Sequence, residues 1–234
     1  SSATANAVFA LLSSGEELLS PQGTDVTFKV GNQTITPDKQ DVQTGTAYFK
    51  KSWEGPQVNK GMSEIEVEKT DESISWGSVY VQYFKELSEV ESHATKISVK
   101  KDVYRVKQTD QGDKLVKVTK SSKVEVGDRM RYRIGLESDR MLEYLHLGDG
   151  RAAGFEPTAN QSGYHHQDGL AYYRAIKDAS VDFFIQYMRP GTYVLEYDMF
   201  AEQSGTFSNG IATLQSLYAP EFSAHSKGQK IVVE

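Results

Sequence analysis

Cysteine is absent from all 234 residues of the chain. The chain therefore has no disulfide, no thiolate metal ligand, no cysteine nucleophile and no thioester built on a cysteine. Long hydrophobic runs are missing too. None approaches the roughly 20 residues that span a bilayer, so direct membrane insertion is not expected. A basic excess is also lacking, since 26 Lys and Arg stand against 32 Asp and Glu. Surfaces that bind phosphate backbones need that excess, so nucleic acid is not an expected partner.

Helical patterning is scarce and is confined to the start of the chain. Residues 3–19 place apolar side chains near helical spacing among several alanines, and Pro21 closes the segment. Residues 7–12 are all apolar, so more than one face of this helix requires burial. We interpret it as the last helix of a helical domain that precedes Ser1, which is neither an initiator Met nor part of a signal peptide.

Beyond Pro21 the apolar residues recur with a period of two, as in β-strands. Many short runs of this kind, separated by Gly, Asn and Pro turns and not by helices, are typical of antiparallel sandwiches. The predicted fold class is all-β, with antiparallel β-sandwiches and one N-terminal helix remnant. The runs expected to form strands are 26–30, 34–36, 64–68, 76–84, 97–99, 132–136, 183–187, 193–199 and 231–233.

A polar stretch at residues 88–95 lies between two strongly strand-like runs and is the best internal boundary. It divides the chain beyond Pro21 into segments of about 65 and 140 residues, both ordinary domain sizes.

A glycine-rich motif at residues 148–153 formally fits the G-x-G-x-x-G/A dinucleotide fingerprint. That fingerprint requires a helix immediately afterwards, because the N-terminus of the helix holds the pyrophosphate. Gly154 and Pro157 would end any helix within a few residues. A glycine-rich loop is therefore favoured over a cofactor site, and no cofactor is predicted.

The densest cluster of polar and aromatic residues is Tyr164-His165-His166-Gln167-Asp168. Two histidines and an aspartate could bind a metal, but on a strand His165 and His166 point to opposite faces. An exposed or interface loop is the favoured interpretation, and no metal site is predicted.

No other residues form a convincing catalytic group. Ser223 and His225 lie close in sequence, yet no serine sits in the G-x-S-x-G pattern of a nucleophile elbow. The 32 acids offer no pair that stands out for glycoside hydrolysis. Trp53 and Trp76 could stack on sugars, although core packing is favoured for Trp76, which lies within a strand pattern. The chain is therefore not expected to be an enzyme.

An ordered set of runs resembles the bacterial alpha-2-macroglobulin family, most strongly from about Val79 to the end. Trp-Gly-Ser-Val-Tyr-Val-Gln-Tyr-Phe at 76–84 is similar to the strand that closes the family's CUB-like domain. Four further runs are similar to its final macroglobulin-like domain: Asp-Arg and Leu-Glu-Tyr-Leu-His-Leu within 139–147, Arg-Ala-Ala-Gly-Phe-Glu-Pro at 151–157, Gly-x-Phe-Ser-Asn-Gly at 205–210, and Tyr-Ala-Pro-Glu-Phe followed by His-Ser within 218–226.

The resemblance implies three parts. Residues 1–20 would be a helix remnant of an upstream thioester-type domain, 21–90 a partial CUB-like β-sandwich, and 91–234 a terminal macroglobulin-like β-sandwich. The family traps proteases with a Cys–Gln thioester and a bait region. This chain has no such thioester, because Gln203 is not preceded by the required Cys.

The function that the resemblance implies is that of a non-catalytic scaffold in a protease inhibitor of the cell envelope, periplasmic or anchored as a lipoprotein. Its expected partners are the upstream domains of its parent chain and, through the parent, target proteases. The alternative is a cell-surface sandwich that binds glycan or another protein. The residues expected at an interdomain contact are Tyr164, His165, His166, Tyr172 and Tyr173.

Overall fold

The computed structural model describes residues 2–13, 26–37, 48–70, 75, 77–119 and 121–234. It divides into two compact units, Ser1–Gln82 and Tyr83–Glu234. The division falls between residues 82 and 83, whereas the polar stretch at 88–95 was the boundary suggested by the sequence. The assignment of these units to family domains remains a prediction.

The first unit begins with α1 (Ser2–Ser13), where a helix was predicted. The predicted continuation over residues 14–19 lies outside the described residues. The side chains described in α1 are all exposed, including the apolar Val8 and Phe9 at 49% and 72%.

A three-stranded antiparallel sheet follows, in the order β2-β1-β3. The strands predicted at 26–30 and 34–36 form a hairpin, in which β1 (Val26–Val30) pairs with β2 (Gln33–Ile35). On its other edge β1 pairs with β3 (Ile65–Lys69). Gly31 turns between β1 and β2 with φ +56°, and a Cβ there would lie 2.7 Å from the Gly61 carbonyl oxygen, so glycine is required.

Two short 3-10 helices precede β3, namely η1 (Gly55–Gln57) and η2 (Lys60–Ser63). Among the described residues of this unit, only Val30 and Pro37 are buried. The hydrophobic core of this part is therefore small.

The predicted strand over 76–84 is wrong for residues 77–84, which belong to no sheet, while Trp76 lies outside the described residues. Their apolar side chains are exposed, from 64% at Val79 to 105% at Phe84. The aromatic and β-branched composition does favour a strand, but a strand also needs a neighbour for its backbone hydrogen bonds. No described strand supplies one.

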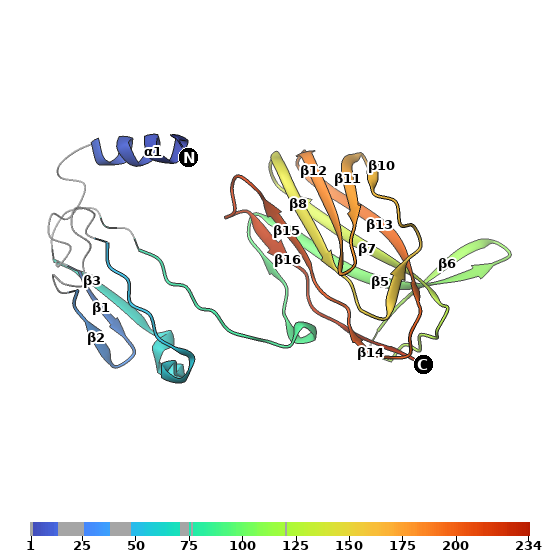
Figure 1. Cartoon of the computed structure of the whole chain (residues 1–234), viewed down its shortest axis with the longest axis horizontal. Coiled ribbons are helices and arrows are strands. Elements are labelled where there is room, and N and C mark those ends of the chain that lie inside the picture. Colours follow the sequence, from blue (N-terminus) through green and yellow to red (C-terminus); the bar gives the residue numbers. More distant parts are fainter. Residues whose placement is uncertain (1, 14–25, 38–47, 71–74, 76, 120) are drawn as a thin grey trace. The chain divides into compact units, whose positions relative to one another are not determined.

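The second unit is a β-sandwich of a seven-stranded and a five-stranded sheet (Figure 1), which confirms the all-β class. The seven-stranded sheet has the order β10-β11-β12-β8-β15-β16-β4, the five-stranded sheet β6-β5-β7-β13-β9, and β14 pairs with β17 separately. Apart from one isolated parallel bridge, all pairs are antiparallel. The elements are η3 (Leu87–Glu89), β4 (His93–Ala94), β5 (Ile97–Thr109), β6 (Gly112–Lys117), β7 (Arg129–Ser138), β8 (Leu142–Gly150), β9 (Phe155–Pro157), β10 (Gly163–Gln167), β11 (Leu170–Ile176), β12 (Ser180–Met188), β13 (Gly191–Ala201), β14 (Gly205–Ser208), β15 (Ala212–Ser216), β16 (Ser223–His225) and β17 (Lys230–Val233).

The core of the sandwich follows from the period-two pattern of its strands. In β7, Met130, Tyr132, Ile134 and Leu136 are fully buried, and the residues between them are less buried. These side chains meet those of the other sheet, such as Phe183, in one continuous cluster. The packing leaves the other face of each sheet outside this core.

Candidate functional site

A row of rings crosses the outer face of the seven-stranded sheet. Cross-strand register pairs Tyr164 with Tyr173, Tyr173 with Phe184, and Phe184 with His146, on β10, β11, β12 and β8. Because residues directly opposite each other share a face of the sheet, all four side chains project to the same side. We call these four residues the aromatic row.

The rings of the aromatic row contact each other in pairs. Tyr164 meets Tyr173 edge to face, with centroids 5.1 Å apart, and His146 stacks on Phe184 at 5.0 Å. Tyr164 is 87% exposed and Phe184 40% exposed. A group of rings this open to water suits a contact with another surface more than a role inside this sandwich.

A hydrogen-bonded carboxylate borders the row. Asp182 accepts from Ser180 Oγ at 2.8 Å, lies 2.7 Å from His146 Nε2 and forms an ion pair with Lys177. Burial alone would raise the pKa of Asp182, but hydrogen bonds from Lys177, Ser180 and His146 outweigh it and hold that pKa below its usual value. The hydroxyl and the imidazole both contact the carboxylate and not each other, so this group is not a serine triad.

The structure divides the five predicted contact residues between two faces. Tyr164 and Tyr173 lie outward in the aromatic row, and His166 is exposed beside them. Tyr172 is only 4% exposed in the core, and His165 stacks on it at 5.8 Å. Burial and the nearby charge of Arg174 lower the pKa of His165.

Phe184 and His146 belong to the aromatic row, but they were not predicted from the sequence as contact residues. A usable signal was the pair Phe183-Phe184, because two adjacent residues of one strand face opposite sides. Phe183 is fully buried, so Phe184 must face outward. His146 carried no comparable signal, since it reaches the row only through the pairing of β8 with β12.

The end of the predicted cluster is a structural turn. Asp168 (φ 51°) and Gly169 (φ 78°) join β10 to β11 in a tight hairpin. Asp168 Oδ2 accepts from the Val194 amide at 2.7 Å, and Gln167 Oε1 accepts from the Glu196 amide at 3.1 Å. The turn thus satisfies open backbone groups of β13 in the other sheet.

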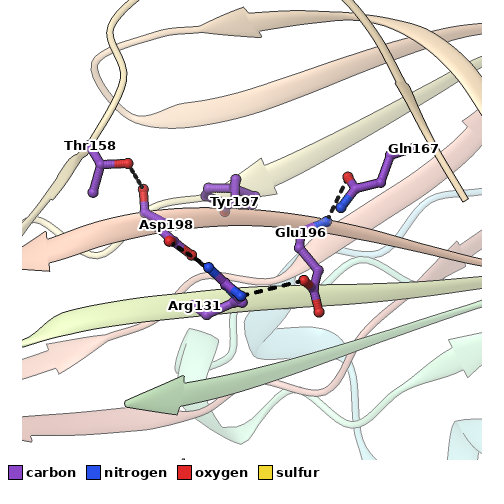
Figure 2. A pocket seen from close by; sticks show the side chains of 6 residues that line it. All are labelled: Arg131, Thr158, Gln167, Glu196, Tyr197 and Asp198. Carbon is purple, nitrogen blue, oxygen red and sulfur yellow. Dashed lines mark hydrogen bonds and ion pairs between the residues drawn. The ribbon is translucent and has the colours of Figure 1, made fainter. Parts of the chain in front are cut away.

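A hollow of about 240 Å³ opens beside this turn (Figure 2). Its charged groups are already paired: Arg131 donates to both oxygens of Asp198 at 2.8 and 3.0 Å and lies 3.9 Å from Glu196. Because the described charges of the hollow pair with each other, it offers a ligand no free ion. Its lining residues are Arg131, Thr158, Gln167, Glu196, Tyr197 and Asp198.

The glycine-rich run was predicted as a loop, but its first three residues, 148–150, are the end of β8, and only residues 151–153 lie beyond the strand. Its Asp149 is fully buried and lies 2.6 Å from Lys101 Nζ on the opposite sheet. Lys101 Nζ also donates to the carbonyls of Gly150 at 3.0 Å and Asn209 at 2.7 Å, while the Tyr197 hydroxyl donates to Asp149.

Burial lowers the pKa of Lys101, and the Asp149 carboxylate opposes that shift. Three acceptors satisfy the three ammonium hydrogens, so the buried charge is fully hydrogen-bonded. The Lys101 side chain is 2% exposed and that of Asp149 0%, so no substrate reaches the pair. This ion pair ties the two sheets together.

The part of the chain that the structure describes contains no group of three or more His, Cys, Asp or Glu suited to a metal ion. Nor does any described helix have the length and apolar character needed to cross a membrane.

The comparison with protein families gives a match that lies within the sandwich of the second unit. Residues 97–221 match the family model of the bacterial alpha-2-macroglobulin MG10 domain, over more than half of the chain. No curated protein sequence matches the chain.

Solved structures of bacterial alpha-2-macroglobulins share the fold. A tyrosine-to-glycine mutant of Salmonella alpha-2-macroglobulin and the same protein reacted with methylamine each superpose with a TM-score of 0.50 at 14% identity, covering 89% of this chain and 13% of theirs. Trypsin-activated alpha-2-macroglobulin from Escherichia coli gives a TM-score of 0.48 at 11% identity, over 89% of this chain and 14% of that one. The chain therefore spans a small part of the length of these proteins.

Proposed function

Since the chain belongs to the bacterial alpha-2-macroglobulin family through its MG10 domain, we propose that it is the non-catalytic C-terminal part of a protease-trapping protein. In this proposal the second unit is a scaffold whose outer face contacts the parent's other domains. The observation that carries it is the aromatic row, whose outermost ring, Tyr164, is 87% exposed on the face of the sheet that lies outside the core.

The proposed domain assignment has three parts: a helix remnant at 1–20, a partial CUB-like sandwich at 21–90 and the terminal macroglobulin-like sandwich at 91–234. The exposed apolar side chains of α1 and of residues 77–84 support it, because each would be buried by further helices or strands of a parent. The proposed cellular location is the cell envelope, where the parent would be either periplasmic or anchored through a lipoprotein N-terminus. Fractionation of cells with an antibody to the second unit tests that location.

Burial of the aromatic row would contribute favourable free energy to an interdomain contact. Burying one large aromatic side chain contributes about 1.5–3 kcal/mol, and Tyr164 alone is almost entirely exposed. Tyrosine also leaves its hydroxyl at the wet rim of such a contact. We propose that Tyr164, Tyr173 and His166 meet an upstream domain of the parent, whereas Tyr172 and His165 support the sheet from inside.

The test is Tyr164→Ala in the full-length parent. If the parent carries a thioester, amines should react with it faster, and if it does not, a protease should cut more readily at the domain junction. Tyr218→Ala is the matched control, because Tyr218 is 80% exposed and lies outside the aromatic row. A Tyr164 variant that behaves as wild type in both assays would remove this face from the mechanism.

The glycan-binding alternative finds less support in the ring geometry. Tyr164 and Tyr173 lie at an interplanar angle of 73°, so the two rings do not form one flat platform for a sugar. A glycan array of the chain separates the two proposals, since specific binding that is lost in Tyr164→Ala would favour the alternative.

We also propose that the chain has no catalytic activity of its own. No serine or threonine hydroxyl described in the sandwich is hydrogen-bonded to a histidine, and the carboxylate that accepts from Ser180, Asp182, is already engaged by His146 and Lys177. Assays with peptidase, esterase and glycosidase substrates should show no turnover. Activity that survives repurification and disappears with one substitution would contradict the proposal.

A further inference from the structure

Two histidines face each other across the edge of the seven-stranded sheet. His225 on β16 is the direct cross-strand partner of His93 on β4, and their ring centroids are 5.8 Å apart at 31°. The adjacent pair, Ala224 and Ala94, has Ala224 1% exposed in the core. Because side chains alternate along a strand, both imidazoles lie on the outer face.

We propose that His93 and His225 together bind one divalent transition-metal ion, with Cu²⁺ bound most tightly. Imidazole nitrogens suit copper, nickel and zinc, and Cu²⁺ heads the stability order of these ions. This site is independent of the proposed interdomain contact.

The spacing of the rings fits a shared ion after a small movement. A metal–nitrogen bond of about 2.1 Å places the ion about 3.2 Å from each ring centroid, so the centroids stand about 4.5 Å apart at a right angle and about 5.2 Å at a tetrahedral angle. The observed 5.8 Å therefore requires the rings to approach by roughly 1 Å. His93 is exposed and free to make that adjustment.

The hydrogen bonding of His225 prepares it as a ligand. Its Nδ1 lies 3.3 Å from the Ser226 carbonyl oxygen, which can only accept, so Nδ1 carries the proton. The lone pair is then on Nε2, and a backbone carbonyl behind the ring is the usual partner of a metal-bound histidine. Glu91, two residues before His93 in the sequence, is paired with Lys227 at 3.1 Å, and water would complete the coordination.

The other three histidines, His146, His165 and His166, have no histidine as a cross-strand partner. His146 is held by Asp182, and His165 stacks inward on Tyr172. His166 is exposed but faces Ala171 and not another histidine, which makes it a matched control.

Cu²⁺ is titrated into the full chain by calorimetry in the presence of a weak competing chelator, and the complex is examined by electron paramagnetic resonance. One ion per chain should bind, with hyperfine coupling to two imidazole nitrogens. His93→Phe retains a ring but removes the ligand, and it should weaken affinity about 100-fold, as should His225→Gln, because the second imidazole acts intramolecularly. His166→Phe should bind as wild type.

Equal affinity in wild type and His93→Phe would overturn the proposal, and so would an equal loss in His166→Phe. Far-UV circular dichroism of each variant shows that the fold is kept, which an exposed position such as His93 should permit.

Discussion

Lys101 is the residue of the second unit whose replacement should be most costly. Lys101→Met leaves the Asp149 carboxylate buried without its cation, and removing one partner of a buried ion pair costs about 3–5 kcal/mol. Urea unfolding followed by near-UV circular dichroism of the tyrosines should show this loss. The double variant Lys101→Met/Asp149→Leu should recover most of it, because no charge is then left unpaired.

A matched surface pair provides the control for that measurement. Lys123 and Glu234 form an ion pair with side chains 75% and 57% exposed, so Lys123→Met should change stability by less than about 1 kcal/mol. If Lys101→Met cost no more than Lys123→Met, the ion pair would not tie the sheets.

Asp198 should make the second unit sensitive to acid. Burial alone would raise the pKa of Asp198, but hydrogen bonds from Arg131 and Arg129 outweigh it and lower that pKa. A carboxyl whose pKa is lower in the folded state stabilises it above the unfolded pKa of about 3.9, and this contribution is lost as the pH falls through the folded pKa. Asp198→Asn should therefore be less stable at pH 7 and decline less between pH 4 and pH 2. Parallel pH profiles of urea stability for the two proteins would contradict this.

At the scale of the elements, the sequence predicted those strands whose apolar residues alternate clearly, such as β1, β7 and β13. The same alternation indicates that Lys101 faces the core. Ile97, Val99 and Val103 are buried on β5, and residue 101 has the same parity, so its side chain lies on the same face of the strand. Its partner Asp149 could not be predicted, because which strands face each other across a sandwich depends on long-range packing. The aromatic row was only partly predictable for the same reason. Composition alone also misassigned residues 77–84, where no partner strand is described.

The elements of the two units should differ in local stability. The sheet β2-β1-β3 has few buried side chains, whereas the sandwich has one continuous core. Hydrogen exchange should therefore show residues 26–69 opening more readily than residues 97–234. Because a dimer that completes the small sheet would protect it, the experiment is made on a confirmed monomer. Equal protection of the two regions there would contradict a partial first domain.

On the scale of the whole molecule, the family relationship gives the exposed segment at 77–84 a physical meaning. Five of its side chains, Val79, Tyr80, Val81, Tyr83 and Phe84, are between 64% and 105% exposed. An extended run of aromatic and β-branched residues is a template for pairing with another strand. In a longer parent chain, strands from elsewhere in the sequence can complete such a sheet.

The segment should therefore be unprotected in the 234-residue chain and protected in the parent. Peptides covering residues 77–84 are compared by hydrogen exchange in both proteins, and peptides from β7, buried in the sandwich core, serve as the internal reference. Pairing should slow exchange within the segment by orders of magnitude and leave β7 unchanged, because backbone amides in a ladder exchange only when it opens. Tyr80→Pro should abolish that protection, since proline removes an amide and disrupts a central strand. Exchange that is equally fast in both proteins would show that the segment is a linker, and the CUB-like assignment of residues 21–90 would then fail.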